Sequence, residues 1–266
     1  MKATVFLGGG RITGALLAGL RLSGYKLPLL VHDRNASKLR ALGREFQVEA
    51  MLDLKSAVER AGMLIVAVRP DSVADLLAEV ARCGAARRPM MAVSLVAGIP
   101  LRKLRTFLGF PVCWARAMPS PVSRVGRGLT GVAFDGKCSK ADRRRVRGFF
   151  QHVGPVLEIP EAQFDAFTAT YSSSHGYHAL ATLAKAARAK GLTREIALTA
   201  AAHALADGIS YWREIGLELS ELLHEAVTPG GIAAATLKAM DKSGYEEVVT
   251  RGLRAGIQQA RANSRR

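Results

Sequence analysis

Two glycines near the start of the chain have the spacing of a phosphate-binding loop. Gly8 and Gly10 follow the β-rich run ATVFL and precede a helical pattern over Ile12 to Leu22. Glycines at this point allow a tight turn, and they let backbone N–H groups approach a pyrophosphate at the start of the helix. The third position of the pattern is usually Gly or Ala, and here it is Thr13, with Gly14 beside it. We therefore predict a dinucleotide site, with a purely structural turn as the alternative.

The residues after the second predicted strand, Leu29 to His32, bear on which dinucleotide binds. Asp33 is an acid of the kind that holds the ribose hydroxyls of NAD. The polar residues that follow could instead hold the 2′-phosphate of NADP: Arg34, Asn35, Ser37 and Lys38. Because donors and cations outnumber the carboxylate, we expect NADP(H), with NAD(H) as the alternative cofactor. A helix start capped by Asn35 would explain that residue alone.

A Pro-Gly-Gly turn near the end of the chain, in VTPGGIAAAT (residues 227–236), precedes an Ala-rich helical pattern. The first N–H groups of a helix have no partner within it, so they can bind an anion such as a substrate carboxylate. The residues directly after the glycines, Ile232 and Ala233, carry no hydroxyl group. The same letters could simply end one helix and begin the next.

Two histidines, His175 and His178, are three residues apart, a spacing that would place them on one face of a helix. A pair at this spacing can bind a metal ion, but no nearby acid or cysteine completes a ligand set, so no metal site is predicted. His175 could face a substrate pocket as a hydrogen-bond donor or proton source. A role in capping the helix or in an interface is the alternative.

The elements that would position these residues change in character along the chain. The first part alternates β-rich runs with helical patterns, which indicates βαβ units around a parallel sheet. After the two runs named above, further strands are predicted at Met63 to Val68, Met90 to Leu95, Val112 to Ala117, Thr130 to Phe134 and Val156 to Ile159.

Beyond Pro160 the strand patterns stop and Ala-rich helical patterns begin, at Ala179 to Lys190, Arg194 to Ile215 and Ser220 to Glu225. We therefore predict an α/β Rossmann-like N-terminal domain over residues 1–159 and an all-α C-terminal domain over residues 160–266. Helices with such broad apolar surfaces usually pack against other helices or against a second subunit.

Composition narrows the classes of protein further. The 266 residues are 49% hydrophobic and 23% charged, as in a globular protein, and no apolar run is long enough to cross a membrane. Arg11 and a glycine cluster interrupt the apolar N-terminal stretch, so we do not expect a secretion signal and predict a cytoplasmic protein. Three scattered cysteines indicate neither a disulfide framework nor a zinc cluster.

The net charge of +16 favours phosphorylated or carboxylated ligands. The basic residues are dispersed and no nucleic-acid motif accompanies them, so we predict neither a nucleic-acid partner nor a membrane partner.

Five stretches, in order, resemble one family over nearly the whole chain. They are AVRPDSVADLLAEV (67–80), SLVAGIPLRKL (94–104), RAMPSPVSRVGRGLTG (116–131), FDAFTATYSSSHGYH (164–178) and VTPGGIAAATLKAMDKSGYEE (227–247). Together they resemble pyrroline-5-carboxylate reductase. The resemblance implies hydride transfer from NADPH or NADH to the C=N carbon of 1-pyrroline-5-carboxylate, which yields L-proline. It also implies a Rossmann domain and a helical domain that interlocks two subunits, with dimers often assembled into larger rings.

The resemblance assigns roles to individual residues. It places the pyrophosphate on Gly8, Gly10, Arg11 and Ile12, and the adenosine phosphate near Arg34, Asn35 and Lys38. It places the nicotinamide near Val68, Arg69, Pro70, Ala97, Gly98, Met118 and Pro119. It places the substrate near Ser173, Thr228, Gly230, Gly231, Ile232 and Ala233, with Thr228 and His175 as the candidate catalytic residues.

The departures from the family pattern concern the substrate. The family's Ser-Gly-Ser-Gly-Pro-Ala-Tyr is here Tyr171 to Tyr177, and its Ser-Pro-Gly-Gly-Thr-Thr is here Thr228 to Ala233. The Asn and Thr that follow Met-Pro in the family are Ser120 and Pro121. The second threonine, whose hydroxyl is placed to bond the ring nitrogen, falls on Ala233.

Losing one neutral hydrogen bond costs about 0.5 to 1.5 kcal/mol, or about tenfold in rate. A slow or retuned reductase is therefore physically possible without this hydroxyl. The alternatives are a reductase of a different imine or carbonyl substrate, and a catalytically weak paralogue that binds dinucleotide.

Overall fold

The computed structural model describes residues 2–84 and 88–264. The chain forms two compact units. The first contains the residues up to Tyr171 and the segment that begins at Ala255, and the second runs from Ser172 to Arg254. The predicted domain boundary between residues 159 and 160 stays a prediction.

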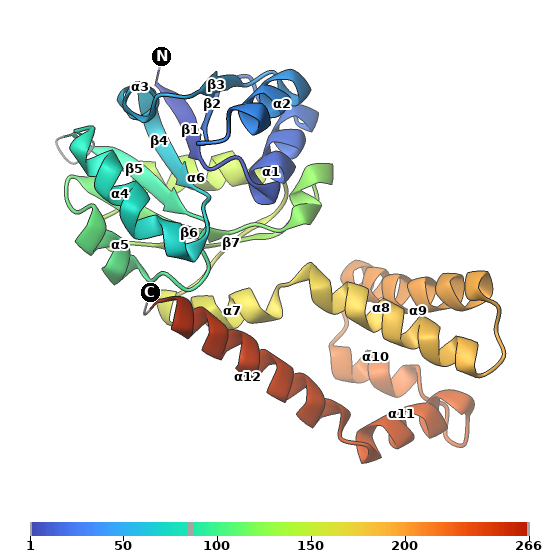
Figure 1. The fold of residues 1–266 in the computed structure, drawn as a ribbon. Helices are drawn as coiled ribbons and strands as arrows, with labels where there is room; N and C mark the ends of the chain where they lie inside the picture. Colours follow the sequence, from blue (N-terminus) through green and yellow to red (C-terminus); the bar gives the residue numbers. More distant parts are fainter. Residues whose placement is uncertain (1, 85–87, 265–266) are drawn as a thin grey trace. The chain divides into compact units, whose positions relative to one another are not determined.

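The first unit is built on an eight-stranded sheet with the strand order β3-β2-β1-β4-β5-β6-β7-β8 (Figure 1). All the predicted strands are confirmed, with ends that match or are shifted by at most two residues. The strand that the sequence did not indicate is β3, which is short and mostly exposed and therefore has no alternating pattern. The strands are β1 (Ala3–Leu7), β2 (Leu29–His32), β3 (Glu49–Met51), β4 (Ala61–Val66), β5 (Met90–Ser94), β6 (Val112–Met118), β7 (Thr130–Phe134) and β8 (Val156–Glu158).

The sheet is not wholly parallel, and the prediction was wrong at one pair of strands. β6 and β7 are antiparallel, with Ala115 opposite Phe134, whereas the other neighbouring strands are parallel. A parallel pair needs a crossover of a dozen or more residues, usually a helix. The segment between β6 and β7 is shorter and contains only the 3-10 helix η3 (Pro121–Val125), so the chain turns back along β6.

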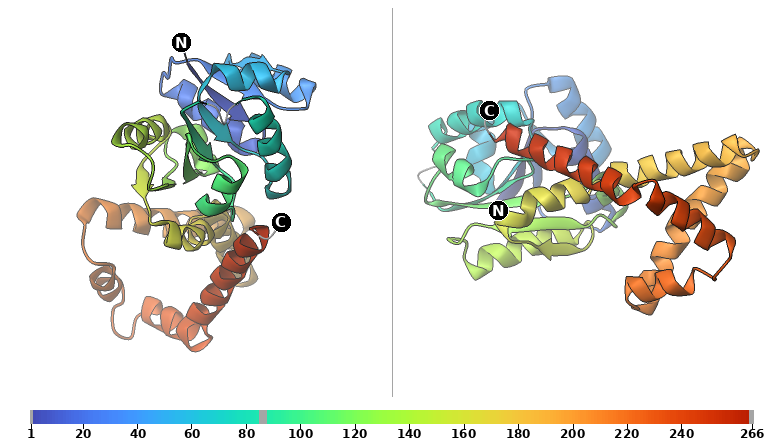
Figure 2. Two further views of the ribbon diagram at one scale, coloured as in Figure 1. Left: turned by 90° about the vertical axis from the view of Figure 1, so that its left-hand side faces the viewer. Right: turned by 90° about the horizontal axis from the view of Figure 1, so that it is seen from below.

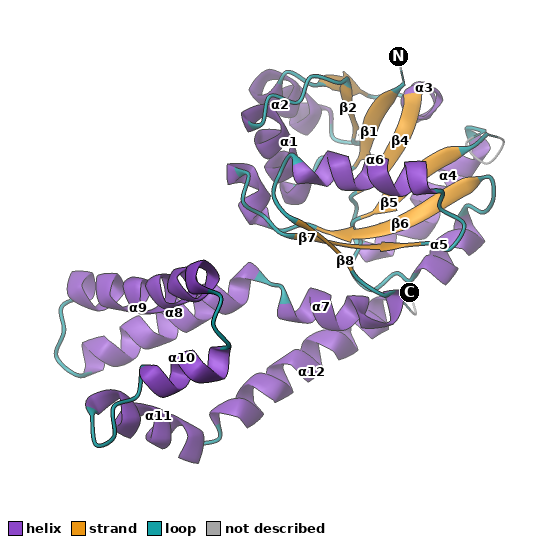
Figure 3. Cartoon of the chain, turned by 180° about the vertical axis from the view of Figure 1, so that it is seen from behind, coloured by secondary structure: helices purple, strands orange, loops and turns teal. Residues whose placement is uncertain are grey.

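Helices cover both faces of the sheet, because neighbouring residues of each strand point to opposite faces. Val5 and Leu7 of β1 pack into the core under α3 (Leu54–Arg60), α4 (Val73–Arg82) and α5 (Leu101–Phe107), which lie in front in Figure 1. Phe6 packs into the core under three other helices on the opposite face of the sheet. Figure 3, which views the molecule from the other side, shows one of them, α6, in front of the sheet. These helices are α1 (Arg11–Leu22), α2 (Ala36–Phe46) and α6 (Lys140–Gln151).

The C-terminal segment of the chain belongs to the first unit. α7 (Phe164–Thr170) and the end of α12 (Tyr245–Asn263) lie side by side, and a Cβ on Gly256 would come within 3.2 Å of the Ala169 Cβ (Figure 2). The short helices η1 (Pro70–Ser72) and η4 (Glu161–Gln163) also belong to this unit. The amide of Asn263 donates to the Ala97 carbonyl at 3.5 Å, so the last helix is held against the residues that follow β5.

The second unit is all helical, as predicted, and α8 packs against α9. Residues 172–254 are all described, and the buried ones among them are three alanines: Ala184, Ala197 and Ala201. α8 starts six residues earlier than its predicted start at Ala179, because serines and Gly176 hide the helical pattern. The helices are α8 (Ser173–Ala189), α9 (Arg194–Ile215), α10 (Leu219–Glu225), α11 (Ile232–Lys242) and the first part of α12.

Two further features concern the cysteines and the helices. Cys83, Cys113 and Cys138 are free thiols. Within the described ranges, no helix is both long and apolar enough to cross a membrane.

One buried cation joins the sheet to the segment that leads into α7. Arg116 of β6 is 2% exposed, and its guanidinium bonds Glu161 at 3.2 Å and Asp165 at 2.9 Å. The same group lies over the Phe164 ring at 4.2 Å. A buried guanidinium needs such partners because its desolvation is costly.

Replacing this cation should destabilise the fold. We expect Arg116→Leu to lower the free energy of unfolding by about 3 kcal/mol, because it leaves Glu161 and Asp165 without their buried partner. Urea unfolding at one fixed protein concentration measures the change. Arg147→Leu is the control, because Arg147 and Glu158 form an exposed pair and the expected loss is under about 1 kcal/mol. Equal losses for the two variants would contradict this role of Arg116.

Candidate functional site

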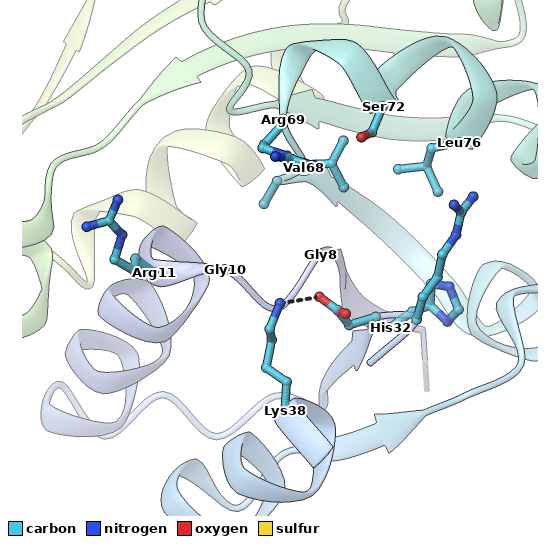
Figure 4. Close-up of a pocket in the computed structure, with 12 residues that line it drawn as sticks. Gly8, Gly10, Arg11, His32, Lys38, Val68, Arg69, Ser72 and Leu76 are labelled. Atoms are coloured by element: carbon cyan, nitrogen blue, oxygen red, sulfur yellow. Dashed lines mark hydrogen bonds and ion pairs between the residues drawn. The ribbon is translucent and has the colours of Figure 1, made fainter. Parts of the chain in front are cut away.

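A cavity of about 560 Å³ opens where β1, β2 and β4 end. Ligands of open α/β sheets bind at this edge, outside the carboxyl ends of the strands. Figure 4 shows the glycine loop facing Val68 and Arg69 across the cavity. Its lining comprises Gly8, Gly10, Arg11, His32, Asp33, Arg34, Lys38, Ala67, Val68, Arg69, Ser72 and Leu76.

The backbone of Gly8 is held between two strand ends. Its N–H donates to the His32 carbonyl at 2.8 Å, and the Ala67 N–H donates to the Leu7 carbonyl at 2.8 Å. Gly8 has a φ of +106°, and a Cβ there would lie 2.5 Å from the Ala67 carbonyl oxygen. No side chain fits at this position, so the loop requires glycine.

Thr13 occupies the third position of the glycine pattern without disturbing the loop. The side chain is fully buried, and its Oγ1 donates to the Gly8 carbonyl at 2.6 Å. The larger residue is therefore accommodated by a hydrogen bond that fixes the same turn.

The start of α1 is suited to an anion. Gly10 is its N-cap residue and provides no side-chain cap, and the first turn contains no acidic residue. Arg11 adds a positive charge in that turn and lines the cavity. Unpaired N–H groups and a nearby cation attract a phosphate at this place.

Asp33 directly follows β2 and contacts the glycine loop at Gly9. Its carboxylate accepts from the backbone N–H groups of Gly9 at 2.8 Å and Asn35 at 2.9 Å, and from Lys38 Nζ at 3.3 Å. Burial acts to raise the pKa of Asp33, but the Asn35 and Gly9 N–H groups and the Lys38 charge together bring the pKa below its ordinary value. Asp33 therefore carries a negative charge at neutral pH.

Asn35 and Arg34, which also follow β2, have protein partners as well. The Asn35 side chain caps α2 by accepting from the Lys38 N–H at 3.0 Å, so the capping interpretation of Asn35 is confirmed. The Arg34 guanidinium bonds Glu79 of α4 at 2.9 Å.

The structure brings together part of the set predicted for the cofactor. The predicted residues that line the cavity are Gly8, Gly10, Arg11, Arg34, Lys38, Val68 and Arg69. The predicted residues outside its lining are Ile12, Asn35, Pro70, Ala97 and Met118. Sequence reasoning missed His32, Ala67, Ser72 and Leu76. His32 and Ala67 are the residues at strand ends that the topology brings to one edge, whereas Ser72 and Leu76 gave no separate signal.

Ala97 and Gly98 follow β5 and contact the last helix. Gly98 has a φ of +82°, and a Cβ there would meet the Ala260 carbonyl. Met118 ends β6, and two residues later the Ser120 hydroxyl accepts from the Tyr171 hydroxyl at 3.0 Å. Both Ser120 and Tyr171 are departures from the family pattern, and they are hydrogen-bonded to each other.

The Pro-Gly-Gly turn lies in the second unit at the start of α11. The Gly231 N–H donates to the Thr228 carbonyl at 2.9 Å, so this N–H closes the turn. Gly231 is the N-cap residue, with no side-chain cap and no acid in the first turn. Available N–H groups therefore begin at Ile232, whose side chain is 89% exposed. Gly230 has a φ of +77°, which suits the turn.

Ser173 and His175 lie in the first turn of α8, also in the second unit. The His175 N–H donates to the Ser172 carbonyl at 2.9 Å, and the hydroxyls of Ser172 and Ser174 are hydrogen-bonded at 2.7 Å. Ser173, His175 and the Pro-Gly-Gly turn are the predicted site residues that lie in the second unit.

Comparisons with known proteins cover the whole of this architecture. Residues 4–98 match the family described as NADP oxidoreductase coenzyme F420-dependent, and residues 161–263 match the one described as pyrroline-5-carboxylate reductase dimerisation. The fold is similar to that of a Plasmodium falciparum pyrroline carboxylate reductase with NADP bound, with a TM-score of 0.87, 20% identity and coverage of 99% and 98% of the two chains. The fold is also similar to that of a Coxiella burnetii pyrroline-5-carboxylate reductase, with a TM-score of 0.88 and 22% sequence identity. That match covers 99% of this chain and 98% of the other.

A full-length relative settles the family. A pyrroline-5-carboxylate reductase of Mycobacterium tuberculosis is 31% identical, and the alignment covers 99% of this chain and 96% of that protein. The chain belongs to the pyrroline-5-carboxylate reductase family.

Proposed function

We propose that this protein is an NAD(P)H-dependent oxidoreductase that reduces 1-pyrroline-5-carboxylate to L-proline, with NADPH as the expected hydride donor. The observation that carries the proposal is the cavity at the ends of β1, β2 and β4, in a chain of this family. Its glycine loop and uncapped helix start suit a dinucleotide. The relatives named above bear the name of this reaction.

The residues around the cavity fit the cofactor. A methyl group on Gly10 would meet no protein atom within 4 Å, so the backbone is open to a pyrophosphate there. Gly8, Gly10, Arg11 and Ile12 would hold the pyrophosphate, and Arg34, Asn35 and Lys38 the adenosine phosphate. Val68, Arg69, Pro70, Ala97 and Met118 would line the nicotinamide side. A reduced nicotinamide, when bound, supplies the hydride.

The substrate would be held by groups of the second unit. The N–H groups of Ile232 and Ala233 at the start of α11 would bind the carboxylate, with Gly230 and Gly231 forming the turn. Thr228 and Ser173 would add hydroxyls. The nitrogen must end protonated, and a pyrrolinium ion enters with that proton. His175 would supply it to the neutral imine.

A homo-oligomer follows from the dimerisation family that the C-terminal region matches. We propose a homodimer, with assembly of dimers into larger rings as an extension. Its support is the second unit, which buries little of its own apolar surface: Tyr177, Ile209 and Leu219 are each at least half exposed. Exposed apolar surface of this extent indicates a protein interface.

Location and other partners stay predictions. We propose a cytoplasmic protein with neither a nucleic-acid nor a membrane partner, and the free thiols support the reducing compartment.

The glycine loop gives the first test of the proposal. We expect Gly10→Ala to keep the melting temperature, because Gly10 has a φ of −77° and free space around its Cβ position. It should weaken NADPH binding by about tenfold or more, since the methyl group would occupy the pyrophosphate position. Titration of NADPH against the purified protein measures this. Gly136→Ala, at an exposed turn with equally open space, should change neither property. Unchanged NADPH affinity in Gly10→Ala would contradict this site.

The substrate loop gives the second test. Wild-type protein should oxidise NADPH in the presence of 1-pyrroline-5-carboxylate, and Ala233→Thr should raise the rate by up to about tenfold, because it adds one hydrogen bond to the ring nitrogen. Initial rates over a range of pH measure both effects. Tight NADPH binding without turnover would exclude the proposed reaction.

A second candidate keeps the chemistry and changes the substrate. The observation that favours it is the pairing of two departures, Ser120 and Tyr171, beside the end of β6, together with the exposed Ile232. In this case the site reduces a different imine or carbonyl compound, or binds dinucleotide with little turnover. A loss of activity in Ala233→Thr would support it, since the hydroxyl would then enter a pocket shaped for another ligand.

A further inference from the structure

Two cations line the cavity beyond the end of β2, and each is already paired with a carboxylate. Lys38 Nζ lies 3.3 Å from Asp33, and Arg34 Nη2 lies 2.9 Å from Glu79. These are the positive charges available for a 2′-phosphate at this end of the cavity. The two carboxylates cancel them, so the excess of donors in the sequence does not translate into an excess of positive charge here.

Asp33 and a 2′-phosphate compete for the same kind of partner. Both groups only accept hydrogen bonds when ionised, whereas a 2′-hydroxyl can donate. The Asp33 side chain is 15% exposed and fixed by backbone N–H groups from both sides. A ribose hydroxyl can therefore bond Asp33, while a phosphate is repelled by it and must draw Lys38 away.

Glu79 contacts Arg34 from a different element. It lies on α4, whereas Arg34 follows β2. The side chains are 37% and 74% exposed, so the pair is weak and Arg34 can exchange partners. Neutralising Glu79 would leave Arg34 in place with no competing carboxylate.

We propose that Glu79 limits the preference of this protein for NADPH over NADH by holding Arg34, in addition to the ribose contact that the sequence predicts for Asp33. This inference rests on the proposed dinucleotide site and not on which substrate is reduced. It makes Glu79 a positioning residue for cofactor choice that lies outside the residues lining the cavity.

Two nucleotide fragments isolate the effect without any turnover. Adenosine 2′,5′-bisphosphate carries the 2′-phosphate and adenosine 5′-monophosphate lacks it, so the ratio of their dissociation constants reports the preference alone. In calorimetric titration of the full chain, Glu79→Gln should lower the dissociation constant of the bisphosphate by about three- to fivefold. The dissociation constant of the monophosphate should stay within about twofold of its wild-type value. Asp33→Asn should shift the ratio in the same direction and also weaken NADH.

A double-mutant cycle separates the proposed route from a general change of charge. In an Arg34→Gln background, Glu79→Gln should no longer change the ratio, because the residue through which it acts is gone. Glu45→Gln removes the same charge from an exposed pair with Arg124 and should leave the ratio unchanged. Melting temperatures check that each variant is folded.

The outcomes distinguish this inference from the proposed function. If both fragments bind and Glu79→Gln leaves their ratio unchanged, the inference is wrong while the dinucleotide site stands. The inference is also wrong if Glu45→Gln shifts the ratio as much as Glu79→Gln. If neither fragment nor NADPH binds to wild type, the dinucleotide site is wrong, and this inference is overturned with it.

Discussion

The carbonyl oxygen of Ala67 lies where a side chain on Gly8 would begin, 2.5 Å from the Cβ position. This close approach draws the loop after β1 against the end of β4, while the Gly8 N–H bonds the end of β2. Three neighbouring strand ends are thus joined through one residue. The start of α1, Asp33 and Val68 take their positions around the cavity from that junction, and Thr13 reinforces it through the same carbonyl group of Gly8.

Local patterns predicted much of this unit. The spacing of Gly8 and Gly10 and the alternation of the strands depend on neighbours in the chain, so they could be found from the sequence. The antiparallel β7 could not, because its direction depends on the path of a short connection. The hydrogen bond of Thr13 could not be predicted either, because its acceptor, the Gly8 carbonyl, belongs to a turn whose exact shape is set by β4.

The local charge around the polar residues after β2 could not be predicted from the sequence either. Counting donors and cations in the sequence favoured NADP, but the count ignored partners. Asn35 caps its own helix, Lys38 contacts Asp33, and Arg34 contacts Glu79, which is 45 residues away. Only the fold brings Glu79 to Arg34. A sequence can therefore indicate a phosphate site, whereas its net charge depends on residues from another element.

The helical unit was predicted correctly as helical, but its packing could not be predicted from the sequence. α8 and α9 were predicted from alanine-rich patterns, yet the residues that are buried within 172–254 are alanines alone, and Gly231 uses its own N–H to close the turn before α11. The strand-end cavity is proposed to serve hydride transfer to a C=N carbon. The most direct measurement uses NADPH carrying deuterium on the transferred position and mass spectrometry of the product formed from 1-pyrroline-5-carboxylate. Hydride transfer at this site predicts proline with one deuterium on the ring carbon next to nitrogen that does not bear the carboxylate. Unlabelled proline, or no proline, would contradict it.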